Sequence, residues 1–244
     1  MKQNIKIITL VFIAFISTNA VLFAKKKETD NDFLSYVVNP QKENIKLFWK
    51  DEKQQLFRSI QQLKFWLEQH HQKLVFAMNA GMYTTNNSPC GLFIENQKMM
   101  HKLNTGSGSG NFFLQPNGVF YISTDNVATI CKTNSFVNNG KIKYATQSGP
   151  MLVIDGKINN IFKAGSINVN IRNGVGVLSN NQIVFVMSKT AISLYDFANY
   201  FKKLGCKNAL YLDGFISRTY LPEKKWIQTD GDFGVMIGIT TNGR

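Results

Sequence analysis

Two segments of the chain repeat apolar residues at helical spacing. Residues 51–70 carry such residues on one face every three or four positions, which predicts a helix. Residues 193–204 show the same spacing between a capping-box start at Ser193 and a glycine stop at Gly205. The second helix is therefore expected to pack back onto the fold and to lead into the apolar run at 209–212.

Most of the remaining chain alternates short apolar runs with turn signals, which is typical of β-strands. Asp155-Gly156 predicts a two-residue hairpin turn, and Asn180-Asn181 plays a similar role. The expected strands are residues 44–50, 74–78, 92–95, 119–123, 151–154, 157–158, 175–178, 183–187, 209–212, 218–221 and 235–240. Strands and helices do not alternate regularly. The expected fold class is therefore α+β, an antiparallel-rich mixed β-sheet with two principal covering helices.

The first 24 residues have the pattern of a secretory signal peptide. Two lysines without an acidic residue precede an apolar run at 7–16, and cleavage is expected after Ala20 or Ala24. An uncleaved anchor is the alternative, but polar residues at 17–19 leave the run short of the ~20 residues of a membrane span. We expect a periplasmic or secreted protein with no stable membrane span after cleavage. The mature chain is expected to have a partly disordered segment at 25–40 and a single domain at 41–244.

Composition and charge narrow the choice of partners. Hydrophobic residues make up 44% of the chain and charged residues 18%, as in ordinary globular proteins. A net charge of +13 favours anionic partners, but the lysines are scattered and form no recognisable nucleic-acid module, so no nucleic acid is expected. The three cysteines lack the spacing of a metal site and permit one disulfide at most. Neither a metal nor a cofactor is predicted, and the oligomeric state stays open.

Asp213 is the leading candidate for a catalytic carboxylate. The apolar run at 209–212 leads straight into Asp213-Gly214, where a strand leaves its sheet and a rigid scaffold can present a polar group to a cleft. A solvated turn is the alternative, because Asp-Gly is also a common turn signal. Asp230 and Asp232 lie in a second glycine-spaced acidic loop, which reaches the site, binds a cation or forms a solvated turn.

Four other stretches also interrupt apolar strands with polar residues and glycine. Asn79 follows a strand and can exchange hydrogen bonds with a sugar hydroxyl or a phosphate oxygen, while Gly81 allows close backbone approach. Arg172 offers a planar, permanently charged fork for a phosphate, unless it is a solvated arginine at a strand end. The glycine-rich loop at 105–111 can cradle an anion or serve as a surface turn. The fourth stretch covers residues 146–150.

The order of these stretches and the residues in them make the chain resemble the phosphodiester glycosidase domain family. That family includes the lysosomal uncovering enzyme and many secreted bacterial proteins. The segments that carry the resemblance are residues 76–83 (FAMNAGMY), 110–113 (GNFF), 147–156 (QSGPMLVIDG), 172–176 (RNGVG) and 211–214 (YLDG). They cover nearly the whole of residues 73–240. The exported bacterial branch without assigned substrates is the most similar.

The resemblance implies an enzyme that hydrolyses the bond between a sugar's anomeric carbon and a phosphodiester oxygen, as in N-acetylglucosamine 1-phosphodiesters. Arg172 would bind the departing phosphate, and Asp213 would act as nucleophile, as base or as a stabiliser of positive charge at the anomeric carbon. Asn79 and Ser148 would orient sugar hydroxyls or phosphate oxygens. The other implied substrate-binding positions are Gly81, Gln147, Gly149, Gly174, Gly214, Ser217 and Arg218. The expected partner is a sugar phosphate or a phosphorylated glycan of the cell envelope.

The chain departs from the family pattern after the aspartate. In the uncovering-enzyme branch a run of glycines and a serine follows it, whereas here residues 215–218 read Phe-Ile-Ser-Arg. Bulky side chains thus replace the free backbone that a glycine run would offer, and Arg218 becomes a candidate second phosphate ligand. The substrate is expected to differ from the lysosomal one.

Two functions without catalysis are the alternatives. A noncatalytic envelope protein would bind glycans through its aromatic side chains, and an exported nucleic-acid binder would lose affinity steeply with salt. The enzyme hypothesis instead requires Asn79, Ser148, Arg172 and Asp213 to converge in one pocket, although they are far apart in the sequence.

Overall fold

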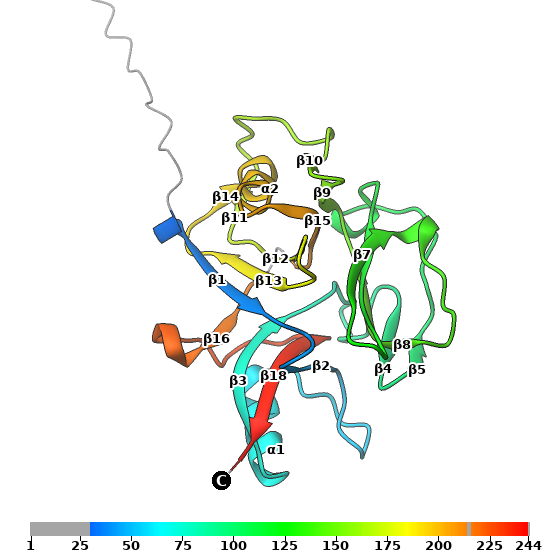
Figure 1. The fold of residues 1–244 in the computed structure, drawn as a ribbon, viewed down its shortest axis with the longest axis vertical. Coiled ribbons are helices and arrows are strands. Elements are labelled where there is room, and N and C mark those ends of the chain that lie inside the picture. The colour runs from blue at the N-terminus through cyan, green and yellow to red at the C-terminus, as the bar shows by residue number, and fades with distance from the viewer. Residues whose placement is uncertain (1–29, 214–215, 244) are drawn as a thin grey trace, which may run out of the picture.

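Antiparallel strands account for most of the regular structure. The computed structural model describes residues 30–213 and 216–243, in which three larger sheets and one two-stranded pair are present (Figure 1). Every strand pair recorded within these residues is antiparallel. The α+β class is confirmed, whereas three separate sheets replace the expected mixed sheet. The expected signal peptide at 1–24 lies outside the described residues.

A six-stranded sheet contains the strand that leads to Asp213. Its strand order is β1-β13-β12-β15-β9-β10. Its strands are β1 (Phe33–Val38), β9 (Met151–Ile154), β10 (Lys157–Ile158), β12 (Asn173–Leu178), β13 (Ile183–Ser188) and β15 (Cys206–Tyr211). The expectation of partial disorder at 25–40 was wrong for β1, because all of its residues pair with β13. The folded region therefore begins before residue 41.

Two five-stranded sheets and a short pair complete the fold. The first sheet has the order β17-β16-β3-β18-β2, and the second has the order β5-β4-β8-β6-β7. The strands of the first are β2 (Asn44–Phe48), β3 (Gln72–Asn79), β16 (Thr219–Leu221), β17 (Trp226–Ile227) and β18 (Met236–Asn242). Those of the second are β4 (Phe93–Glu95), β5 (Lys98–His101), β6 (Gly118–Ser123), β7 (Ala128–Lys132) and β8 (Ile142–Ser148). The short pair consists of β11 (Val169–Asn170) and β14 (Ile192–Ser193).

Both expected hairpins are confirmed. Asp155 and Gly156 join β9 to β10 and have φ angles of 48° and 75°, and a type I′ turn requires positive φ at both central residues. Asn181, between β12 and β13, also has a positive φ of 62°. These turn residues set the register of the strands that they join.

Two α-helices pack against different sheets. In Figure 1, α1 (Ile60–Gln69) lies beside β3 and α2 (Leu194–Lys203) lies beside β15. No helix in residues 30–213 and 216–243 is long and apolar enough to cross a membrane. The short 3-10 helices are η1 (Asp30–Asp32), η2 (Asn111–Phe113), η3 (Thr133–Ser135) and η4 (Pro222–Lys224).

The beginnings of the two α-helices follow local capping chemistry. The Ser193 side chain accepts a hydrogen bond from the backbone nitrogen of Asp196 at 3.1 Å, so the expected start of α2 is confirmed. The expected start of the first helix at residue 51 was wrong. Gln54 and Arg58 have φ angles of 64° and 59°, which lie outside helical backbone, and Ser59 caps the helix that follows.

One apolar core joins the three sheets. Its central cluster includes Leu34 and Val175 from the six-stranded sheet, Phe76 and Ile237 from one five-stranded sheet, and Phe120 from the other. Separate clusters lie between α2 and the six-stranded sheet and between α1 and β3. The strand ends of different sheets are therefore held at fixed positions relative to one another.

Candidate active site

Predicted site residues from three sheets meet where the chain leaves β15. Asn79 is the last residue of β3, Ser148 is the last residue of β8, and Arg172 stands directly before β12. Each bonds one residue of the segment 211–213. The bonds run from Arg172 Nη1 to the Tyr211 hydroxyl (2.9 Å), from Ser148 Oγ to the Leu212 carbonyl oxygen (2.6 Å) and from Asn79 Nδ2 to Asp213 Oδ2 (3.1 Å). These three side chains therefore lie around residues 211–213, and a substrate pocket shared by them with Asp213 stays a prediction.

A buried pair of amides holds Asp213 from two sides. Asn173 Oδ1 accepts a hydrogen bond from the Asp213 backbone nitrogen (2.8 Å), and Asn173 Nδ2 donates to Asn79 Oδ1 (2.9 Å). Asn79 Nδ2 also donates to the Ile216 carbonyl oxygen, and Asn79 Oδ1 accepts from the Arg218 nitrogen. Protein groups thus fill the donors and acceptors of the Asn79 amide. In this structure Asn79 orients the carboxylate and the loop that follows it.

Arg172 is a buried cation bound by neutral oxygen atoms. Its side chain is only 1% exposed. Nε donates to the Ile192 carbonyl oxygen (2.7 Å), and Nη2 donates to the carbonyl oxygen of Asn168 (2.9 Å). Within residues 30–213 and 216–243, no carboxylate forms an ion pair with Arg172. Neutral protein oxygens therefore hold this guanidinium, and it shares the neighbour Tyr211 with the carboxylate of Asp213.

Several neighbouring groups respond to burial and to the charge of Asp213. Burial raises the pKa of Tyr211 to about 12, and the nearby Asp213 adds to this rise although Arg172 opposes it. Burial, with a contribution from Asp213, also raises the pKa of Tyr83 and of the Cys90 thiol. Cys90 is therefore protonated at neutral pH, which makes it a poor nucleophile.

Gln147 lies next to Ser148, but its amide bonds Leu92 and Asn104, which lie outside the strands of the second five-stranded sheet. Its Oε1 accepts hydrogen bonds from the nitrogens of Leu92 (3.0 Å) and Asn104 (2.9 Å), and its Nε2 donates to the Asn104 carbonyl oxygen (2.7 Å). These bonds fix the base of the glycine-rich loop at 105–111, whose first six residues are exposed. Gln147 is therefore an anchor for that loop in this structure.

Three predicted glycines are required by close packing. A side-chain carbon at Gly81 would lie 2.6 Å from the Gln147 carbonyl oxygen, and one at Gly149 would lie 2.8 Å from the Phe112 carbonyl oxygen. At Gly174 it would lie 2.9 Å from the Leu210 carbonyl oxygen. Gly81 brings the end of β3 against β8, which places Asn79 and Ser148 on either side of residues 211–213. These glycines position the site through backbone packing.

The candidate second phosphate ligand is held in an ion pair at the surface. Arg218 Nε lies 2.9 Å from both carboxylate oxygens of Asp230. Asp232 accepts two hydrogen bonds from Arg58, which lower the pKa of its carboxyl. The acidic loop is thus engaged with arginines and is not a freely solvated turn.

Ser217 is a buried residue within the segment 215–218 that departs from the family pattern. Its hydroxyl donates to the Asp213 carbonyl oxygen at 3.0 Å and lies 3.3 Å from the Ile171 carbonyl oxygen. It links the end of β15 to the residue before Arg172. Gly214 lies outside the described residues.

Sequence reasoning did not identify Asn173, Tyr211, Tyr83 or Cys90 as parts of this environment. Asn173 had a usable signal, because it is an amide at the start of a buried apolar strand and directly follows Arg172. Tyr211 lies two positions before Asp213, a spacing that places strand residues on one face. The other two depend on how β3 and the loop after it fold around the carboxylate.

The cysteines and acidic residues form neither a disulfide nor a metal-binding cluster in the part of the chain that the structure describes. Cys90, Cys131 and Cys206 are all free thiols. No group of three histidine, cysteine, aspartate or glutamate residues gathers there in a way that could hold a metal ion. The absence of a metal or cofactor requirement stays a prediction.

Comparison with known proteins gives one family and one close sequence relative. The family model for phosphodiester glycosidases matches residues 72–240. The uncharacterized protein YigE of Escherichia coli is 40% identical over 188 residues, which are 77% of this chain and 73% of that protein.

Solved structures share the fold at low sequence identity. The catalytic domain of zebrafish N-acetylglucosamine-1-phosphodiester alpha-N-acetylglucosaminidase is 14% identical, with a TM-score of 0.57 over 88% of this chain and 85% of that one. A putative exported protein from Burkholderia pseudomallei is 9% identical, with a TM-score of 0.55 over 85% of this chain and 73% of that one. The family match covers more than half of the residues, and this chain belongs to the phosphodiester glycosidase family.

Proposed function

We propose that the protein is an exported hydrolase that cleaves the bond between C1 of a sugar and an oxygen of its phosphodiester. The proposed substrates are cell-envelope or extracellular glycans with a linkage like that of N-acetylglucosamine 1-phosphodiesters. The observation that carries this proposal is the placement of a buried Arg172 and an amide-held Asp213 near the same residue, Tyr211. Family membership and the activity named for the zebrafish protein support it.

Each of these two residues stabilises one of the charges that develop during the reaction. Breaking the bond from C1 to oxygen leaves positive charge on the sugar ring and negative charge on the departing phosphate. Arg172 stabilises the phosphate, and Asp213 stabilises the anomeric carbon, attacks it or activates water. Water supplies a hydroxyl to C1 and a proton to the released phosphomonoester. Because a phosphate is a good leaving group, the reaction depends less on a strong general acid than ordinary glycoside hydrolysis does.

The amide pair keeps the carboxylate in the orientation that this chemistry needs. Asn79 binds a carboxylate oxygen, and Asn173 binds the backbone nitrogen of the same residue. Both amides are buried and bonded to each other, so Asp213 has little freedom to rotate. A carboxylate fixed before substrate binds costs less reorganisation during the reaction.

Export is proposed from the sequence of residues 1–24, which have the pattern of a signal peptide. A structurally similar Burkholderia protein is itself described as a putative exported protein. A periplasmic or secreted location would place the enzyme beside envelope glycans that carry phosphodiester linkages. Fractionation of cells that express the full chain tests this placement, and retention of an uncleaved protein in the cytoplasm would contradict it.

Hydrolysis of a panel of sugar 1-phosphodiesters by the purified mature chain tests the activity. We expect the parent to release free sugar and Asp213→Asn to release none. Asp125→Asn is the matched control, because Asp125 is an exposed carboxylate in the turn between β6 and β7. Glycan binding that survives in both variants, without turnover by the parent, would instead identify a noncatalytic glycan-binding protein.

A further inference from the structure

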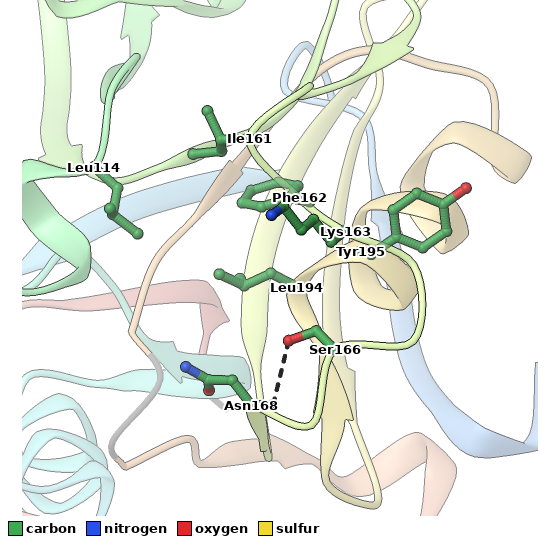
Figure 2. A pocket seen from close by; sticks show the side chains of 8 residues that line it. All are labelled: Leu114, Ile161, Phe162, Lys163, Ser166, Asn168, Leu194 and Tyr195. Carbon is green, nitrogen blue, oxygen red and sulfur yellow. Dashed lines mark hydrogen bonds between the residues drawn. The ribbon is translucent and has the colours of Figure 1, made fainter.

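Two hollows of opposite character border residues 114–117. Figure 2 shows the first, in which the apolar side chains of Leu114, Ile161 and Leu194 are directed toward a common space. The second, which we call the polar cavity, has a volume of about 100 Å³. It is lined by residues 104–106 at the start of the glycine-rich loop, by residues 115–117, and by residues 132–134 at the end of β7. The fold thus brings three polar segments around one small space.

The lining of the polar cavity contains no carboxylate. Its charged residue is Lys132, and no carboxylate in residues 30–213 and 216–243 forms an ion pair with it. Three of the four amide side chains in the lining already use their oxygen atoms. Asn104 Oδ1 accepts from the Gly106 nitrogen (2.9 Å), Asn134 Oδ1 from the Ser135 hydroxyl (3.3 Å) and Gln115 Oε1 from the Asn117 nitrogen (3.4 Å). Few lone pairs are therefore left to repel an anion.

Hydrogen-bond donors of the lining, in contrast, are left over. The Thr133 side chain is only 6% exposed, and its Oγ1 accepts a hydrogen bond from Gln147 Nε2 at 3.2 Å, so its own hydrogen is available to a ligand. Among the residues that the structure describes, no side-chain or backbone acceptor bonds the Thr133 hydroxyl, the Thr105 hydroxyl, the Lys132 ammonium group or Asn134 Nδ2. A cation, two hydroxyls and an amide N–H are the donors that an oxyanion accepts from.

The surrounding sheet adds to the attraction for an anion. Residues 93–148, which form the second five-stranded sheet and its loops, carry five lysines and only two acidic residues, Glu95 and Asp125. Both acids lie toward the end of the sheet where Ala128 pairs with Ile122, whereas Lys132 pairs with Gly118 at the other end. The four residues from Ala128 to Lys132 span about 14 Å, at ~3.4 Å per residue. This exceeds the screening length of about 8 Å at physiological salt, so the two carboxylates do not cancel the charge of Lys132.

The size of the polar cavity limits what enters it. A single water needs about 10–15 Å³ of such space, so the volume of about 100 Å³ accommodates the four oxygen atoms of a phosphate group. A whole sugar ring does not fit beside them. Any larger ligand therefore enters with its anionic group alone and leaves the rest outside.

We propose that the polar cavity binds a phosphate group, with Lys132 as its cation and the buried Thr133 hydroxyl as a fixed donor. This site is separate from residues 211–213. Gln147 bonds Thr133, whereas its neighbour Ser148 bonds Leu212, and successive strand residues point to opposite faces. The proposal therefore does not depend on the proposed function. The phosphate is either the free ion or a group on a phosphorylated sugar whose ring lies outside the cavity.

Titration with inorganic phosphate, followed by the backbone amide NMR signals of the mature chain, tests the site. Sodium chloride would keep the ionic strength constant during the titration. We expect saturable shifts at Thr105, Thr133 and Asn134, with a millimolar dissociation constant. Shifts that grow without saturation, or that are spread evenly over the lysine-bearing surface, would overturn the proposal.

Variants of the two principal donors locate the binding. Lys132→Gln should weaken phosphate binding at least about fivefold, because the charge-assisted bond is lost. Thr133→Val should weaken it at least about threefold, whereas Thr133→Ser keeps the hydroxyl and should bind like the parent. Thermal unfolding of both Thr133 variants verifies the fold, since this hydroxyl also bonds Gln147.

Lys141→Gln is the matched control for Lys132→Gln. Both lysines are exposed in the same sheet region, but Lys141 lies near the Asp125 turn, where its carbonyl oxygen accepts from the Thr124 nitrogen. We expect Lys141→Gln to bind phosphate like the parent. An equal loss in Lys132→Gln and Lys141→Gln would mean general attraction to a basic surface and would reject the cavity, even if Thr133→Val does not fold.

A comparison of three ligands identifies the source of the phosphate. Binding of glucose 6-phosphate at least as tight as that of inorganic phosphate would identify a group on a sugar, and binding of inorganic phosphate alone would identify the free ion. The same shifts with unphosphorylated glucose would contradict an oxyanion site. Asp213→Asn should bind phosphate like the parent whether or not the chain is a glycosidase. Loss of binding in that variant would overturn the separation of the two sites.

Discussion

Asn173→Ala is expected to destabilise the protein because Asn173 holds Asp213 through a fully buried amide. The substitution removes the acceptor of the Asp213 backbone nitrogen and the donor to Asn79. A buried N–H left without a partner costs about 1–3 kcal/mol, and the small cavity adds about 1 kcal/mol. We expect the free energy of unfolding to fall by about 3 kcal/mol. For a chain of this size, that corresponds to a Tm lower by about 6–12 °C.

Urea unfolding of the parent, Asn173→Ala and Asn180→Ala would measure this effect. Asn180 is an exposed turn amide bonded to Gln182, so its removal should change the free energy of unfolding by less than about 0.5 kcal/mol. A double-mutant cycle with Asn79→Ala should show a coupling of at least about 0.5 kcal/mol, since the two amides contact each other. A loss below about 1 kcal/mol in Asn173→Ala, or strict additivity in the cycle, would refute the role of this amide pair.

Three further substitutions test other parts of the structure. Gly81→Ala should lower the free energy of unfolding by about 1–3 kcal/mol, because the added carbon meets the Gln147 carbonyl oxygen; a Tm equal to the parent's would contradict this packing. Tyr211→Phe should cost about 1–3 kcal/mol by removing a buried acceptor of Arg172, which urea unfolding can measure, and a neutral effect would mean that this bond contributes nothing. Burial raises the pKa of Glu95 from 4.5 to about 7, so its protonated form is favoured in the folded state. The free energy of unfolding should therefore fall as the pH rises from 4.5 to about 7, by on the order of 1–3 kcal/mol. Glu95→Gln should flatten that part of the profile, and an unchanged slope would remove Glu95 as its source.

The elements with strong local signals were predictable from the sequence. The α2 start at Ser193 and the Asp155-Gly156 hairpin both depend on chemistry within a few residues, and both are confirmed. The first helix shows where such reasoning fails. Leu56 matches the helical spacing of the residues after it, but it instead forms an isolated β-bridge with Lys50. Apolar spacing alone could not distinguish a helix from a β-bridge at Leu56. Ser59, however, is a capping residue from which the true start of the helix could have been predicted.

The prediction of partial disorder at residues 25–40 was wrong for its second half, because it rested on the composition of the whole segment. Charged residues occupy its first part, while Phe33–Val38 is an apolar and β-branched run. Its strand is stabilised by pairing with β13, which lies about 150 residues further along the chain. Such long-range pairing leaves no local trace beyond β propensity.

The sequence predicted which residues lie near one another better than it predicted which groups they bond. Asn79, Ser148 and Arg172 each bond one residue of the segment 211–213, because three strands from different sheets end at one place. The direction of each side chain was not predictable. Gln147 is adjacent to Ser148, and successive strand residues point to opposite faces, so its amide turns away to bond Asn104. The Arg218 side chain likewise finds Asp230, a partner that lies in a loop the sequence could not place.

The position of bond cleavage tests the central claim most directly. A sugar 1-phosphodiester would be hydrolysed in ¹⁸O-labelled water, and the released phosphomonoester would be examined by ³¹P NMR. If Arg172 binds the departing phosphate and the reaction occurs at C1, the phosphomonoester retains its original oxygen atoms and contains no ¹⁸O. Incorporation of ¹⁸O into the phosphomonoester would mean attack at phosphorus, and would contradict the glycosidase.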